Sequence, residues 1–157
     1  MSRDDALAAI EAVYRDRFAG LVRFAQAITG DEQAALDAVH DGFVRAVRYR
    51  RGLRDPDAAA GWICRIVANE ARRNRRPVIV PVEPAVESTN GHHEGAAVRA
   101  ALAALPERQR LALFLRYYAD LDYAGIAEAL GISRGTVSAT LHAAHSNMQT
   151  QLMEVDR

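Results

Sequence analysis

The sequence predicts an all-α protein made of two small helical domains joined by a flexible linker. Alanine fills 31 of the 157 positions, and it has the highest helix propensity of all residues. Apolar side chains recur every three or four residues over long stretches, as they do along one face of an amphipathic helix. A segment rich in proline, glycine and glutamate lacks this period, and it divides the chain into domains 1–76 and 96–157 with a linker at 77–95.

The domain 1–76 is predicted to be a bundle of three to four helices. A first helix ends at Thr29-Gly30, and its apolar stripe is Leu7, Ile10, Tyr14, Phe18, Leu21, Ala25 and Ile28. Asp31 can cap a second helix, whose inward stripe is Ala35, Val39, Phe43 and Val47. Asp55-Pro56 is a helix-start signal for a third, whose apolar set is Trp62, Ile63, Ile66 and Val67.

The domain 96–157 is predicted to contain two helices on either side of Pro106, followed by a helix-turn-helix. The two helices carry Val98, Leu102 and Leu105, then Leu111, Phe114, Leu115 and Tyr118. In the helix-turn-helix, Gly131 permits a left-handed turn residue and Ser133 caps the second helix. The helix pair is held together by Ile126, Leu130, Val137 and Leu141. Such a motif reads DNA through the major groove.

The charge of the chain is unevenly distributed, although 20 basic and 20 acidic residues cancel in total. Every basic residue is arginine. Residues 45–76 hold ten arginines against three acids, which gives +7, whereas 1–44 sum to −4 and 77–98 to −3. A block of +7 produces a local positive field of the kind that attracts nucleic acid.

Other classes of protein fit the sequence poorly. No run of 18 apolar residues is present, so no membrane insertion is expected, and the start of the chain has no export signal. Cys64 is the single cysteine, and His92-His93-Glu94 lies in a glycine-flanked segment that makes a poor metal site. No phosphate loop or nucleophile constellation appears, so we expect a cytoplasmic protein that is not an enzyme and needs no cofactor or metal.

Two runs in the first domain resemble region 2 of the extracytoplasmic-function (ECF) sigma factors of the sigma-70 family. The runs are Leu36-Asp37-Ala38-Val39-His40-Asp41-Gly42-Phe43-Val44-Arg45-Ala46-Val47 and Gly61-Trp62-Ile63-Cys64-Arg65-Ile66-Val67-Ala68-Asn69. The chain departs from the family pattern at His40, Val47 and Cys64. The resemblance implies that the second helix docks on the β′ clamp helices of core RNA polymerase. It also implies that the loop 50–57 and the third helix open and read the −10 promoter element.

The site residues expected in this domain follow from that resemblance together with the arginine cluster. The polymerase-binding set is Asp37, His40, Asp41, Val44, Arg45 and Arg48. The −10 set is Arg50, Arg51, Arg54, Asp55, Trp62, Arg65, Asn69, Arg72, Arg73, Arg75 and Arg76. Arginines neutralise phosphates, and planar or short polar side chains can stack on or hydrogen-bond an unstacked base. Taken without the resemblance, the arginines at 72–76 could also be a solvated helix end, and Trp62 a core residue.

The second domain is similar to region 4 of the same family, from Leu105-Pro106-Glu107 through Gly135-Thr136-Val137. That resemblance implies contact with the polymerase β flap and with the −35 promoter element. The −35 set is Ser133, Arg134, Thr136, Ser138, Ala139, Thr140, His142 and His145. Several cations usual in the family after Val137 are missing, which predicts intrinsically weak −35 binding that depends on tethering by polymerase.

The linker is long enough for both domains to reach promoter DNA at once. Its 19 residues span at most ~60–68 Å, and elements ~17 base pairs apart are separated by ~58 Å. The leading interpretation is a promoter-specific transcription initiation factor. Its expected partners are promoter DNA, core RNA polymerase and an anti-sigma factor. Two alternatives stay open: a conventional helix-turn-helix regulator, and a degenerate sigma-like protein that acts mainly through protein partners.

Overall fold

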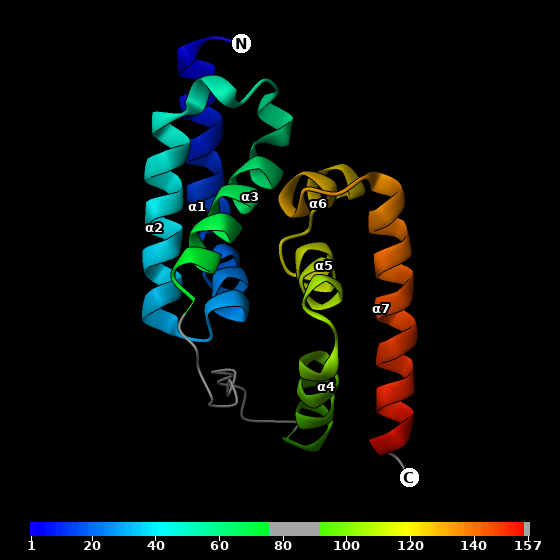
Figure 1. Cartoon of the computed structure of the whole chain (residues 1–157). Helices are drawn as coiled ribbons and strands as arrows, with labels where there is room; N and C mark the ends of the chain where they lie inside the picture. Colours follow the sequence, from blue (N-terminus) through cyan, green and yellow to red (C-terminus); the bar gives the residue numbers. More distant parts are fainter. Residues whose placement is uncertain (76–91, 156–157) are drawn as a thin grey trace.

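The computed structural model describes residues 1–75 and 92–155, which form two helical bundles side by side (Figure 1). The N-terminal bundle contains α1 (Arg3–Thr29), α2 (Glu32–Arg48), η1 (Arg50–Gly52), η2 (Pro56–Ala58) and α3 (Ala59–Arg73). The C-terminal bundle contains α4 (His92–Ala104), α5 (Glu107–Tyr117), α6 (Tyr123–Leu130) and α7 (Arg134–Val155). Within these residues there is no β-strand, and the all-α prediction is confirmed.

The helix ends of the N-terminal bundle are fixed by capping side chains. Ser2 begins α1 with a capping box, because its hydroxyl accepts from the Asp5 N–H at 3.1 Å and its own N–H donates to the Asp5 carboxylate at 3.1 Å. Hydrogen bonding by the Ser2 side chain, and then by its backbone N–H, lowers the pKa of the Asp5 carboxyl. Gly30 ends α1 in the left-handed region with φ 74°, and Asp31 caps α2 by accepting from the Ala34 N–H at 2.9 Å. The predicted interruption and cap are confirmed.

The third predicted helix begins with a tighter turn than expected. Asp55 accepts from the Asp57 N–H at 3.0 Å and Pro56 follows it, so the predicted start signal operates. It opens the 3₁₀ turn η2, and α3 itself begins at Ala59. The consequence is a short, exposed turn at the entrance to α3.

Three parts of the predicted core are wrong, and neighbouring residues are buried in their place. Leu7 and Tyr14 are 36% and 43% exposed, and α1 buries instead Ala6, Val13 and Phe24. Val47 is 41% exposed, and the neighbouring Ala46 is buried in its place. Tyr118 is 60% exposed and stacks on Phe114 with ring centroids 4.8 Å apart. At each of these positions the adjacent residue is the buried one, so the inward face of the helix is turned by about one residue from the predicted stripe.

The helix-turn-helix prediction is confirmed. Asp122 caps α6 by accepting from the Gly125 N–H at 2.8 Å, and Gly131 ends it with φ 66°. The Ser133 hydroxyl accepts from the Thr136 N–H at 3.1 Å at the start of α7. Ile126 and Val137 are fully buried between α6 and α7.

The two bundles share one continuous apolar core, which the sequence did not predict. Phe24 of α1 is fully buried, and its ring centroid lies 6.4 Å from that of Phe114 in α5. Helix α6 packs on α3 (Figure 1). The helix α4 begins at His92, so residues 92–95 of the predicted linker are helical. Residues 77–91 of the linker, and Arg76, lie outside the described residues.

Candidate nucleic-acid interface

The six residues predicted to bind polymerase lie together on one exposed face of α2. Each is exposed, and their spacing of three and four residues keeps them on a single side of the helix. Val44 is 67% exposed at the middle of this face. In Figure 1, α2 lies on the side of the N-terminal bundle away from α7. The face therefore stays open to a partner while the two bundles are in contact.

Glu70 joins α2, the helix that carries the predicted polymerase-binding set, to α3, and it was not expected from the sequence. Its Oε1 lies 2.7 Å from Arg45 Nε and 3.4 Å from Arg73 Nη1. The Glu70 side chain is 10% exposed, whereas the two arginines are about half exposed. One largely buried carboxylate thus holds one residue of the predicted polymerase set and one of the predicted −10 set.

A cavity of about 310 Å³ lies between the end of α2 and the middle of α3. Its lining combines aromatic rings, an amide, a carboxylate and cations: Arg45, Tyr49, Gly52, Trp62, Ile66, Asn69, Glu70 and Arg73. Tyr49 is 56% exposed, and Trp62 is half-buried against the core. Flat rings beside an amide and two guanidinium groups can stack on a base and hydrogen-bond its edge. The cavity brings Trp62, Asn69 and Arg73 together, as predicted, and adds Tyr49.

The remaining cations of the predicted −10 set divide into two groups. Arg51, Arg54 and Arg72 are exposed near this cavity or on α3. Arg50 is half-buried, and its guanidinium donates to the Val47 carbonyl at 2.8 Å. The Arg48 guanidinium lies 5.8 Å from the centroid of the Tyr49 ring, within cation–π range. Arg50 is therefore held against the backbone while its neighbours face outward.

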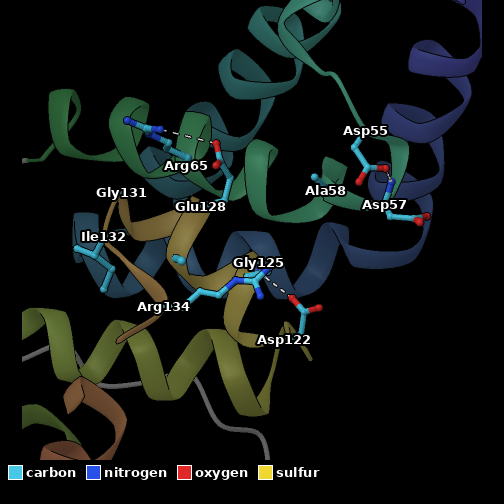
Figure 2. A pocket seen from close by; sticks show the side chains of 12 residues that line it. Asp55, Asp57, Ala58, Arg65, Asp122, Gly125, Glu128, Gly131, Ile132 and Arg134 are labelled. Atoms are coloured by element: carbon cyan, nitrogen blue, oxygen red, sulfur yellow. Dashed lines mark hydrogen bonds and ion pairs between the residues drawn. The ribbon is translucent and has the colours of Figure 1, made fainter. Parts of the chain in front are cut away.

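A second cleft, of about 550 Å³, lies between the two bundles. Figure 2 shows Asp55 and Asp57 of the η2 turn on one side and Asp122 and Arg134 on the other. Across it, Arg65 Nη1 lies 3.7 Å from Glu128 Oε1 (Figure 2). The predicted −10 residues Asp55 and Arg65 thus line a seam with the C-terminal bundle.

Arg75 also faces the C-terminal bundle. Its Nη2 lies 2.6 Å from Glu107 Oε1 at the start of α5, and its Nε donates to the Ile28 carbonyl at 3.2 Å. Arg75 is consequently separated from the cavity around Tyr49. The structure does not bring all the predicted −10 cations into one patch.

The helix α7 presents most of its predicted −35 residues to solvent. Exposed are Ser133, Arg134, Ser138, Ala139, His142 and His145. Thr136 is half-buried, and its hydroxyl lies 2.9 Å from that of Ser133. The Tyr117 hydroxyl lies 2.7 Å from His145 Nε2. This contact between α5 and α7 was not expected from the sequence.

Thr140 does not belong with this exposed set. It is 9% exposed, because it shares the inward face of α7 with Val137, Leu141 and Ala144. Its assignment as a DNA-contacting residue conflicts with this burial and is withdrawn.

The single cysteine of the chain is protected from solvent. Cys64 is fully buried in α3, and burial raises the pKa of its thiol to about 12.

None of the helices in the ranges 1–75 and 92–155 is long and apolar enough to cross a bilayer.

Four residues that line the cavity or pair with the predicted site residues were not expected from the sequence: Tyr49, Glu70, Glu107 and Glu128. Tyr49 had a usable signal, since it is an aromatic residue directly ahead of two arginines at a helix end. Glu70 is an acid within an apolar and basic helix, which is a weaker signal. Glu107 and Glu128 act across the seam between bundles, and a single sequence carries no information on that pairing.

Known proteins resemble both bundles and their order. Residues 13–77 match the family described as Sigma-70 region 2, and residues 95–147 match Sigma-70, region 4. The chain is 30% identical over 154 residues to the RNA polymerase sigma-E factor of Streptomyces avermitilis, covering 93% of this chain and 86% of that one. It is 29% identical over 161 residues to the ECF RNA polymerase sigma factor SigL of Mycobacterium tuberculosis, covering 94% and 91%.

A solved structure shares the fold. It is the sigma factor RpoE from Bartonella quintana, in complex with the anti-sigma factor NepR. The match has a TM-score of 0.68 at 22% identity and covers 98% of this chain and 97% of that one. The two proteins therefore share the arrangement of their helices.

Proposed function

The chain belongs to the extracytoplasmic-function sigma factors of the sigma-70 family, which are transcription initiation factors, and we propose that its two bundles divide promoter recognition between them. The N-terminal bundle docks on core RNA polymerase and holds the opened −10 strand. The C-terminal bundle places α7 in the major groove at the −35 element. The chemistry of RNA synthesis belongs to the polymerase, and we assign none to this chain.

The observation that carries this proposal is the position of the cavity around Tyr49 and Trp62. It lies at the end of α2, and Glu70 ties Arg45 of the docking face to Arg73 at the cavity rim. A base flipped out of the duplex would stack there while the surrounding guanidinium groups neutralise its phosphates. Docking and base capture are thereby linked through one buried carboxylate.

The docking face itself is matched to a protein partner. Asp37, Asp41, Arg45 and Arg48 provide charges of both signs around the exposed Val44. A small apolar centre with a charged rim is the usual composition of a protein–protein contact. We assign this face to the β′ clamp helices, and the C-terminal bundle to the β flap.

Contact with the −35 element rests on few charges. Among the exposed residues of the −35 set, Arg134 is the one arginine, and the others are short or are histidines. Neutral donors make few phosphate contacts, so we propose that α7 binds the groove weakly and depends on polymerase to hold it there. The same observation favours a second candidate, a sigma-like protein that acts mainly through protein partners.

We further propose that this protein works in the cytoplasm and is held inactive by an anti-sigma factor. The support is the similarity to RpoE of Bartonella quintana, which was solved with its anti-sigma factor NepR. Such a partner would cover the α2 face or the cavity beside it, because both stay open in the chain alone.

Reconstituted transcription tests the function. Core RNA polymerase is mixed with the chain and with fragmented DNA of the source genome, and RNA made from defined starts is measured. We expect defined starts that are absent without the chain. The variant Val44→Arg, which places a cation at the centre of the docking face, should abolish them and polymerase binding together. The matched control Leu7→Arg, at an exposed position of α1, should leave both intact. Polymerase binding without RNA synthesis would favour the second candidate.

A further inference from the structure

A tyrosine of α5 and a histidine of α7 form an exposed pair in the C-terminal bundle. The Tyr117 hydroxyl lies 2.7 Å from His145 Nε2, and the two ring centroids are 5.8 Å apart at an interplanar angle of 75°. Tyr117 is 64% exposed, and His145 is exposed as well. Helix α7 lies on the side of the C-terminal bundle away from α2 (Figure 1). The pair is therefore fixed in geometry and open to a ligand from solvent.

The pair lies at one end of a row of exposed residues on α7. The row is Arg134, Ser138, His142 and His145, and spacings of four, four and three residues keep it on one side of the helix. It is ~16 Å long at ~1.5 Å per residue, whereas the major groove is ~12 Å wide. A helix that lies with the start of this row in the groove therefore brings the end of the row to a phosphate backbone.

The hydrogen-bonding capacity of the pair depends on the charge of its histidine. A neutral imidazole carries one N–H donor, and a tyrosine hydroxyl carries one O–H donor. One of these two donors is used between Tyr117 and His145, so one remains. An imidazolium carries two N–H donors, so the charged pair keeps two donors and adds a positive charge. Donors on a charged group form the stronger hydrogen bonds to a phosphate oxygen.

The charged side chains of the helices that pack against α7 are engaged away from the pair. The side chains of α4 that the structure describes are apolar. The carboxylates of α5 and α6 pair with arginines of the N-terminal bundle. In α5, Arg108 lies in the first turn, and Arg110 and Arg116 donate to backbone carbonyls. On α7 itself the titratable neighbour is His142. A phosphate would meet no competing carboxylate from the described parts of these helices.

We propose, resting on the −35 contact proposed above, that Tyr117 and His145 form a binding site for a phosphate of the DNA backbone and take up a proton when they bind it. His145 Nε2 donates to the Tyr117 oxygen, and the Tyr117 O–H and the second N–H of His145 donate to phosphate oxygens. The proton comes from the buffer, and no covalent bond of the DNA changes. Because the bound state holds one more proton, DNA affinity rises as pH falls.

This site compensates for the sparse charge of α7. Among the described residues of the row, Arg134 is the one arginine. A protonated His145 adds a second cation at the opposite end of the row, where the helix leaves the groove. Tyr117 is the positioning residue, since its oxygen holds the imidazole and its proton completes the contact with phosphate.

The test measures DNA affinity at two pH values with the full chain. A short DNA duplex carries a rhodamine dye, whose emission is constant over this range, and fluorescence anisotropy gives the affinity at low ionic strength. The contact is to phosphate, so the sequence of the duplex does not matter. We expect the parent chain to bind roughly three- to tenfold more tightly at about pH 6 than at about pH 8.

Two substitutions remove one half of the pair each. Tyr117→Phe keeps the ring and loses the hydroxyl, and His145→Gln loses the titrating group. Each should reduce the gain at low pH to about twofold or less. His145→Arg supplies a permanent cation and should bind tightly at both pH values. The matched control is Tyr118→Phe, because Tyr118 is also exposed and its ring stacks on Phe114 instead. It should behave as the parent chain does.

Three results overturn the proposal. The first is a gain at low pH that is as large in Tyr117→Phe as in the parent chain. The second is a gain that disappears in His142→Gln but persists in His145→Gln, since the other histidine would then be the titrating group. The third is a Tyr117→Phe variant that is less stable in urea yet keeps the full pH dependence, because the pair would then only tie α5 to α7.

Failure of the underlying function gives a different result. A chain that binds no duplex at either pH does not contact −35 DNA, and both proposals are then wrong. A chain that binds the duplex equally at both pH values retains the −35 contact and lacks the phosphate site at Tyr117 and His145.

Discussion

The Nε atom of Arg45 in α2 lies 2.7 Å from Oε1 of Glu70 in α3, and the Glu70 side chain is 10% exposed. Arg45 belongs to the face assigned to polymerase, and Glu70 lines the cavity assigned to an unpaired base. An ion pair with one largely buried partner is screened less by solvent and salt than an exposed pair. This pair therefore joins the face proposed for polymerase docking to the cavity proposed for base capture by a direct contact.

Removing Glu70 should weaken the N-terminal bundle. Glu70→Ala leaves Arg45 and Arg73 without their shared acceptor, and we expect the free energy of unfolding to fall by about 1–3 kcal/mol. Urea unfolding followed by circular dichroism measures it. The control Glu11→Ala removes an exposed pair with Arg15, where the Glu11 side chain is 69% exposed, and should change stability by about 0.5 kcal/mol or less. Equal stability of the two variants would show that the Glu70 contact contributes nothing.

Tyr49 should matter for strand opening through its ring. Tyr49→Ala removes a stacking surface from the cavity and should weaken capture of the opened strand by about 1–3 kcal/mol. Permanganate reactivity of thymines, at a promoter found by reconstituted transcription, reports the opening. Tyr49→Phe keeps the ring and should open the promoter as the parent chain does. If Tyr49→Phe is as defective as Tyr49→Ala, stacking is not the role of the residue.

Adding a cation to α7 should strengthen duplex binding. Ala139 is exposed on the face assigned to the groove, and Ala139→Arg should steepen the slope of log affinity against log salt by about 0.9 for one new phosphate contact. Fluorescence anisotropy of a labelled DNA duplex, titrated at several salt concentrations, gives the slope. Gln149→Arg adds the same charge near the far end of α7 and should leave the slope unchanged. Equal slopes in the two variants would show that residue 139 does not lie on a face that contacts DNA.

Cys64 should be chemically inert while the protein is folded. Burial raises the pKa of its thiol to about 12 from 9.0, so the reactive thiolate is scarce at neutral pH. Alkylation by iodoacetamide should be slow in buffer and fast in urea, as followed by mass spectrometry. Stability also depends on pH through this thiol, because the unfolded chain loses the thiol proton at lower pH than the folded chain does. The contribution of Cys64 to stability is therefore complete below pH 9.0 and declines as pH rises toward 12.

Local signals in the sequence predicted the helices and their ends well. Asp31, Asp55, Gly131 and Ser133 all act as expected, because a cap or a left-handed turn depends on a few neighbouring residues. The predicted core was less accurate. Leu7, Tyr14 and Val47 lie at the rim although their periodicity is helical, because the inward face is turned by one residue and buries Ala6, Val13 and Ala46 instead.

The sequence predicted which residues are exposed on the candidate site better than it predicted which of them lie together. The α2 face was predicted as a unit, since residues on one side of a helix follow from spacing alone. Arg65 and Arg75 were grouped with the other −10 cations, and they face Glu128 and Glu107 instead. Contacts between residues more than 30 positions apart depend on how the bundles pack, which periodicity along a single chain does not encode. Thr140 was misplaced because it lies on the inward face of α7 beside Val137, Leu141 and Ala144, where it is buried.

Sequencing the 5′ ends of RNA made by core polymerase with this chain, on DNA of the source genome, tests the division of labour most directly. If the N-terminal and C-terminal bundles read separate elements, aligned start sites will share two conserved motifs ~17 base pairs apart, and the upstream motif will be the weaker one. Starts that share no motif, or RNA that is the same with and without the chain, would contradict the assignment.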